Sequence, residues 1–112
     1  MQSEVKIFYF TDNTLKSGDA LDIMFYGNVD IKMIEESYVE VYSSMDEVGD
    51  DIFIYLEKMF EKFNNDENPL SGVDQQNKIS YLNTHTSMSV GDVVKINDTY
   101  YVAKGTGFSK IF

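Results

Sequence analysis

The sequence contains no cysteine, no tryptophan and no arginine, and it has one proline and one histidine. Without cysteine the chain cannot form a disulfide, a thiolate zinc site or a cysteine nucleophile, and such a composition fits a reducing compartment. Without arginine it lacks the side chain that proteins favour for bidentate contacts to phosphate and guanine. These absences exclude several enzyme classes and argue against direct binding of nucleic acid.

Long apolar runs are missing as well. No segment approaches the roughly 20 apolar residues of a membrane helix, and residues 1–11 lack the basic start and apolar run of a signal peptide. We therefore expect a cytoplasmic protein that does not enter a membrane. A chain of 112 residues is long enough to bury one core without covalent cross-links, so residues 1–112 are predicted to form a single domain.

Charge is unevenly distributed along the chain, whose formal net charge is −10. Residues 1–69 hold sixteen acidic residues against five lysines, whereas residues 70–112 hold three against four. The first part therefore carries −11 and the second +1. Acidity of this size either keeps a small protein in solution or attracts a positively charged partner, and it repels the phosphate backbone of DNA and RNA.

Two segments in the first half have the pattern of strands. Residues 4–11 (EVKIFYFT) are rich in Ile, Phe and Tyr, and residues 38–42 (YVEVY) alternate with period two. Residues 20–26 (ALDIMFY) are compatible with a strand or a short helical turn, and residues 31–36 with a helical or an extended segment.

Residues 45–63 are predicted to form the main helix. Ser44 followed by Glu47 matches a capping box, in which the hydroxyl and the carboxylate satisfy free amides at the helix start. Gly49 is unfavourable inside such a helix by roughly 1 kcal/mol. Residues at helical spacing make one broad apolar face, namely Val48, Ile52, Phe53, Leu56, Met59, Phe60 and Phe63.

The remaining chain reads as a polar loop followed by short strands. Residues 64–78 are expected to be an exposed loop, and residues 79–82 a short strand. Residues 93–96 and 99–103 flank Asn97-Asp98, a pair that suits a two-residue hairpin turn, and residues 108–112 form the last strand. The predicted fold class is α+β, with a small antiparallel sheet, one main amphipathic helix packed on one face and a C-terminal β-hairpin block.

No residue pattern indicates catalysis, a cofactor or a metal. His85 is the single histidine and has no carboxylate near it in sequence, so we interpret it as structural. The acids and amides of residues 64–74 do not fall in the register of an EF-hand loop. We therefore predict a protein that is not an enzyme and needs no cofactor.

The acidic residues near the helix form the strongest candidate for a binding site. On a helix over residues 45–63, with ~100° per residue, Asp46, Asp50, Glu57 and Glu61 fall within a stripe of about 60°. Ile54 lies on the same polar side. We predict that these five residues bind a partner, with charge steering the encounter and the apolar side chain slowing release; the alternative is a solvated face with one stray isoleucine.

Motifs in the second half carry a family resemblance. A helix ending in LEKMFEKFN (residues 56–64) precedes Asn68-Pro69, the turn HTSMSVGDVV (residues 85–94), the aromatic pair Tyr100-Tyr101 and the closing Gly107-Phe108. This combination resembles the YodL-like small domains of bacteria, their phages and conjugative elements. The resemblance covers about the C-terminal half and implies a mobile-element setting, with no enzymatic activity. We interpret Gly91-Asp92 as a tight turn that determines the fold.

Charge and resemblance together predict a non-enzymatic interaction protein of a phage or mobile element. Its acidic half would bind and inhibit a basic host protein that handles nucleic acid, such as a nuclease or a CRISPR or restriction component. The alternative is a structural or accessory assembly module of the mobile element, in a homodimeric form.

Overall fold

The computed structural model describes residues 2–11, 32, 34–35, 38–65, 68–81, 84, 87–105 and 107–111. The predictions for residues 20–26 and for His85 lie outside these residues. Of the segment 31–36, the described residues Lys32, Ile34 and Glu35 are helical, which is one of the two forms that the sequence allowed.

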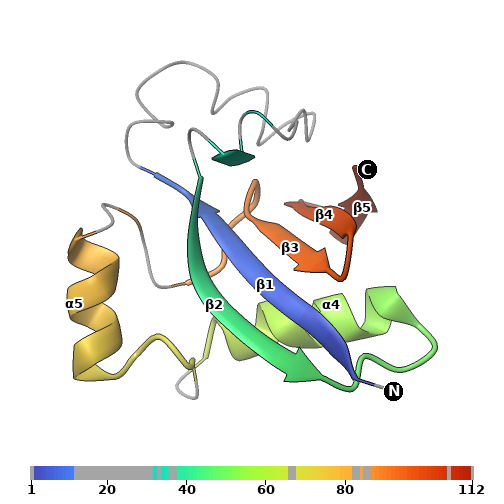
Figure 1. Cartoon of the computed structure of the whole chain (residues 1–112), viewed down its shortest axis with the longest axis horizontal. Helices are drawn as coiled ribbons and strands as arrows, with labels where there is room; N and C mark the ends of the chain where they lie inside the picture. Colours follow the sequence, from blue (N-terminus) through green and yellow to red (C-terminus); the bar gives the residue numbers. More distant parts are fainter. Residues whose placement is uncertain are drawn as a thin grey trace.

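Five antiparallel strands form one sheet in the order β2-β1-β3-β4-β5 (Figure 1). The strands are β1 (Ser3–Phe10), β2 (Tyr38–Asp46), β3 (Val93–Ile96), β4 (Thr99–Lys104) and β5 (Gly107–Lys110). The predicted α+β class is confirmed, as are the two strands expected in the first half. The described part of the chain holds no helix that is both long and apolar enough to span a bilayer.

Alternation along β1 explains why the sheet buries both of its faces. Val5, Ile7 and Tyr9 are fully buried in the core on the side of the sheet that helix α4 (Ile52–Lys62) covers. Phe10 belongs to a second core on the opposite face, together with Ile34, Tyr38, Val93 and Val102. Because the side chains of a strand point alternately to the two faces, one aromatic-rich strand supplies both cores.

The main helix begins seven residues later than predicted. Strand β2 continues through Ser44 to Asp46, so the expected capping box of Ser44 and Glu47 is wrong. Gly49 adopts φ 85°, a left-handed conformation that a helix interior does not contain. Asp51 is the N-cap instead, because its carboxylate accepts hydrogen bonds from the amides of Phe53 (3.1 Å) and Ile54 (3.3 Å).

This correction gives a direct test. Asp51→Ala should lower the free energy of unfolding by about 1 kcal/mol, because an N-cap carboxylate satisfies amides that alanine leaves free. Ser44→Ala is the matched control and should change it by less than about 0.5 kcal/mol, since Ser44 is a half-buried strand residue with no cap to lose. Urea titration followed by circular dichroism measures both. A larger loss for Ser44→Ala than for Asp51→Ala would restore the earlier helix start.

A second helix replaces the predicted loop and short strand. Helix α5 spans Val73–Tyr81 and lies beside β2 (Figure 1), and its Ile79 is the one buried residue of the helix. The side chain of Asn68 connects the end of α4 to the segment before α5. It donates to the carbonyl of Phe63 (2.7 Å) and accepts from the amide of Leu70 (2.8 Å). With a single buried residue, α5 has no apolar periodicity for a sequence pattern to reveal.

The C-terminal hairpins agree with the sequence prediction. Strands β3 and β4 pair across Asn97-Asp98, and Asn97 takes the positive φ of 53° that the turn requires. Its side chain also accepts a hydrogen bond from the amide of Glu4 at 3.1 Å, which ties the turn to β1. Strand β5 pairs with β4 on one side, and no other described strand pairs with its outer edge.

Candidate interaction surface

Asp46 does not belong to an acidic helix stripe. It is the last residue of β2, and its carboxylate accepts hydrogen bonds from the hydroxyl of Tyr55 (2.8 Å) and from the amide of Glu47 (2.9 Å). Burial and, to a smaller extent, the hydrogen bond to Asp46 raise the pKa of Tyr55. Asp46 therefore links β2 to α4, and its predicted place on a continuous helical stripe is wrong.

Asp50 and Asp51 lie at the start of α4, where the dipole of the helix favours negative charge. Both carboxylates are exposed. Together with Phe53, Tyr101 and Lys110 they line a hollow of about 410 Å³ between the helix and the last two strands. Asp50 therefore precedes the helix and lines this hollow, although the sequence placed it on the second turn of a longer helix.

Two adjacent apolar side chains stand beside these acids. Phe53 is 47% exposed and Ile54 is 51% exposed. The sequence predicted exposure for Ile54, which is confirmed, but assigned Phe53 to the buried face. The rings of Phe53 and Tyr101 meet edge to face, with centroids 5.9 Å apart, and nearly half of Phe53 remains exposed.

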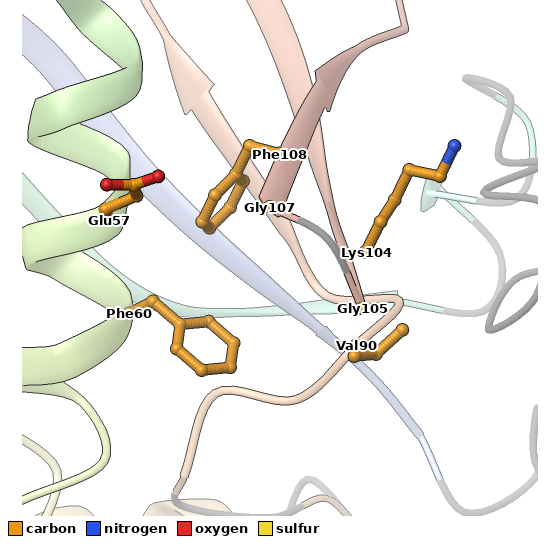
Figure 2. A pocket seen from close by; sticks show the side chains of 7 residues that line it. All are labelled: Glu57, Phe60, Val90, Lys104, Gly105, Gly107 and Phe108. Atoms are coloured by element: carbon orange, nitrogen blue, oxygen red, sulfur yellow. The ribbon is translucent and has the colours of Figure 1, made fainter.

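Glu57 follows one turn later and lines a second hollow, of about 310 Å³. Phe60 and Phe108 meet there edge to face, with ring centroids 6.3 Å apart. Figure 2 shows the Phe108 ring directed toward α4, with Glu57 on one side and Lys104 on the other. The two hollows thus lie along the same junction, with acids on the helix and lysines on β4 and β5.

Glu61 is exposed on the last turn of α4, but its neighbours Lys58 and Lys62 are exposed too. The helix carries two glutamates and two lysines and is therefore neutral by itself. The negative charge is concentrated in the residues that precede it and at Glu57. We call the set Asp50, Asp51, Phe53, Ile54 and Glu57 the acidic apolar surface, and Glu61 lies at its margin.

The SVGDVV motif has a structural role in this fold. Asp92 is fully buried, and its two carboxylate oxygens accept hydrogen bonds from the amides of Phe10 (3.1 Å) and Ser89 (2.7 Å). Gly91 has φ 99°, as expected for a tight turn. The tight turn at Gly91-Asp92 was predicted from the sequence, whereas the bond to Phe10 crosses 82 positions of sequence and no local pattern indicates it.

Burial of two tyrosines beside Asp92 completes this arrangement. Burial, and then the nearby charge of Asp92, raises the pKa of Tyr9 and of Tyr38. The hydroxyl of Tyr38 donates to the carbonyl of Gly91 at 2.5 Å. A phenol held in this way stays protonated and supports the turn, so these side chains stabilise the fold and do not form an accessible site.

No group of three or more potential metal ligands occurs within the described ranges of the chain. The residues that could hold a cation, Asp50 and Asp51, are an exposed pair in which Asp51 already serves the helix amides. What the surface offers is therefore charge and apolar contact.

Comparison with known proteins shows similarity to a viral protein. No family model matches it, and no solved structure matches it. Uncharacterized protein R785 of Acanthamoeba polyphaga mimivirus is 45% identical over 76 residues, which cover 68% of this chain and 70% of the mimivirus protein. At this identity and coverage two chains share one fold and one ancestor. The chain belongs to the same protein family as mimivirus protein R785.

Proposed function

We propose that this protein is a non-enzymatic interaction protein whose acidic apolar surface binds a basic protein that handles nucleic acid. The observation that carries the proposal is the pair Phe53 and Ile54, about half exposed and bordered by Asp50, Asp51 and Glu57. An apolar centre with a charged border is the arrangement by which protein interfaces combine affinity with steering.

Charge supports a basic partner over a neutral one. The chain carries −10, and the three acids Asp50, Asp51 and Glu57 outnumber the two lysines, Lys104 and Lys110, that line the same hollows. A positively charged groove that normally receives nucleic acid presents the complementary potential. A protein that occupies such a groove blocks it, so we propose inhibition as the consequence of binding.

The biological setting is part of the proposal. The mimivirus relative supports a viral setting, and the YodL-like resemblance supports a bacterial, phage or conjugative one. The residues behind that resemblance lie in one packed region, since Asn64 donates to the carbonyl of Met88 at 3.0 Å and Asp92 holds the following turn. In a bacterial setting the target would be a CRISPR or restriction component, and in an amoeba a nuclease.

Capture of partners from lysate tests the proposal. The immobilised protein is incubated with lysates of a bacterium and of an amoeba at low and at high salt, and bound proteins are identified by mass spectrometry. We expect basic nucleic-acid-binding proteins at low salt and fewer at high salt, because screening weakens exposed charge pairs. Recovery of no nucleic-acid-binding protein from either lysate at low salt overturns the proposal.

Variants of the surface give the quantitative prediction. Asp50→Lys combined with Glu57→Lys should weaken binding of a captured partner by more than about tenfold, mainly through slower association. Ile54→Ala should weaken it by about tenfold through faster dissociation. Asp74→Lys, a charge reversal at an exposed position of α5, is the matched control and should bind as the unmodified protein does. Surface plasmon resonance separates the two rates.

The alternative function is an assembly module that pairs with itself. The outer edge of β5 favours it, because no strand of the described part of the chain pairs with this edge and an unpaired strand edge is a template for a second copy. The net charge of −10 on each chain opposes it. Sedimentation equilibrium decides between them, since a stable dimer at low salt supports assembly and a monomer supports binding of a different protein.

A further inference from the structure

The outer edge of β5 presents main-chain groups in a defined order. Ile111 lies opposite Tyr100 and donates its amide to the Tyr100 carbonyl at 2.9 Å. Because the main-chain groups of an antiparallel strand point alternately to its two sides, Phe108 and Lys110 direct their N–H and C=O groups away from β4. Ala103 lies opposite Phe108 on β4, and its main-chain groups bond to Gly91 and Asp92 on the side away from β5. Ala103 and Phe108 therefore do not bond to each other, as this alternation requires.

The side chains of the same two residues point toward α4. Phe108 contacts Phe60, and Lys110 lines the hollow that Asp50, Asp51 and Phe53 border. The Phe53 contact with Tyr101 and the Phe60 contact with Phe108 place α4 alongside β5, and the two hollows flank these contacts. Figure 2 shows one of them, open between the helix and the β4–β5 turn.

An extended segment beside β5 would therefore meet two kinds of group. Its main chain would reach the outward groups of Phe108 and Lys110, with which no described strand pairs, and every second side chain would face α4. There it would find the apolar ring of Phe53 and the carboxylates of Asp50, Asp51 and Glu57. A strand whose α4-facing positions are lysines matches both, because the aliphatic stem of a lysine can lie against the Phe53 ring while its ammonium group reaches the carboxylates.

A second copy of this chain fits the groove less well. Each copy carries −10, so pairing two β5 edges would bring together two acidic molecules. A basic segment is attracted by the same negative charge. The occupant that the observations favour is therefore an extended basic segment of another protein.

We propose that an extended basic segment of the partner adds to the outer edge of β5 as an additional antiparallel strand, with its basic side chains against Asp50, Asp51 and Glu57. This inference rests on the proposed function, because it specifies how the basic partner is held. It adds the binding mode, main-chain pairing at β5, and the chemical class of the segment.

The probe for a test is a capped peptide of three Lys-Val repeats, about the length of one strand, with a Glu-Val peptide as its counterpart. Binding of the Lys-Val peptide to the full chain should shift the amide resonances of Phe108 and Lys110 and slow their hydrogen exchange. The Glu-Val peptide should bind at least about tenfold more weakly because the acids repel it. Unshifted Phe108 and Lys110 amides at saturating Lys-Val peptide overturn the inference.

Two variants at one position separate main-chain pairing from charge. Lys110→Pro removes an outward N–H and leaves the Ile111 bond to β4 in place, and edge strands accept proline at such positions. This variant should bind the Lys-Val peptide at least about tenfold more weakly, since main-chain hydrogen bonds supply the affinity of an added strand. Lys110→Ala keeps the N–H, loses a like charge and should bind more tightly. Thermal unfolding verifies that both variants fold.

The outcomes distinguish this inference from the proposed function. If Lys110→Pro binds as tightly as the unmodified chain while Ile54→Ala weakens a captured partner, docking at β5 is wrong and the acidic apolar surface stands. If β5 resonances shift on self-association in place of peptide binding, the edge serves a second copy and the inference is overturned. If no basic protein is captured at all, the proposed function fails first.

Discussion

Replacing Asp92 by alanine is expected to lower the free energy of unfolding by about 4 kcal/mol, one of the two largest effects that we predict. The carboxylate is fully buried and accepts the amides of Phe10 at 3.1 Å and Ser89 at 2.7 Å. Alanine removes the side-chain acceptor of both amides, one in a buried and one in a partly buried bond, and each such loss costs about 1–3 kcal/mol. Because natural domains are stable by only about 5–15 kcal/mol, this variant should unfold near physiological temperature.

Asp92→Asn refines the expectation. One side-chain oxygen remains to accept from Phe10, but the amide group that replaces the other oxygen presents donors to the Ser89 N–H. The free energy of unfolding of Asp92→Asn should therefore lie between that of the unmodified chain and that of Asp92→Ala. Asp98→Ala, at an exposed position of the β3–β4 turn, is the control for loss of an aspartate. Equal small losses at positions 92 and 98 in urea titration would show that Asp92 does not hold the turn.

The sequence predicts the strands well because each has a local cause. Alternation in β1 and β2, and the Asn97-Asp98 turn between β3 and β4, are properties of neighbouring residues. The start of α4 depends on whether residues 44–46 join a helix or extend strand β2, and the local sequence pattern does not decide between the two. Ser44 and Glu47 match a capping box, yet the pairing of β2 with β1 extends through Ser44, and strand pairing is a long-range contact.

Helix α5 and the binding surface were predicted less well for related reasons. Only Ile79 of α5 is buried, so its sequence looks like a loop. The predicted binding set assumed a helix from residue 45, which placed Asp46 beside Glu57 and left Phe53 in the core. With α4 starting at Ile52, Asp46 belongs to the β2 junction and Phe53 is half exposed. Asp50, Ile54 and Glu57 remain part of the surface that we propose for binding, and Glu61 lies at its margin.

Raising the pH above about 10 is the second change with a large expected effect. Burial, and then the charge of Asp92, raises the pKa of both Tyr9 and Tyr38 above the ordinary value of 10.0. Above this value the unfolded chain releases the protons of Tyr9 and Tyr38, which the folded chain retains. The unfolded state is thereby stabilised relative to the folded state. The stability is fully present below pH 10 and falls by about 1.4 kcal/mol per pH unit for each of Tyr9 and Tyr38, or roughly 2.7 kcal/mol for the two. Tyr55, whose pKa is also raised, adds to the fall in the same direction.

Tyrosinate absorbance and circular dichroism, measured together during an alkaline titration, check this expectation. The two buried tyrosines should ionise only as the β-sheet signal is lost. Tyr38→Phe removes one of them, so it should lower the slope of stability against pH by about 1.4 kcal/mol per pH unit, although it also loses the bond to the Gly91 carbonyl and starts from a lower stability. Tyr81→Phe is the control, since that side chain is 89% exposed and lies outside both cores. Ionisation of all eight tyrosines with the sheet signal intact would contradict the burial of Tyr9 and Tyr38 beside Asp92.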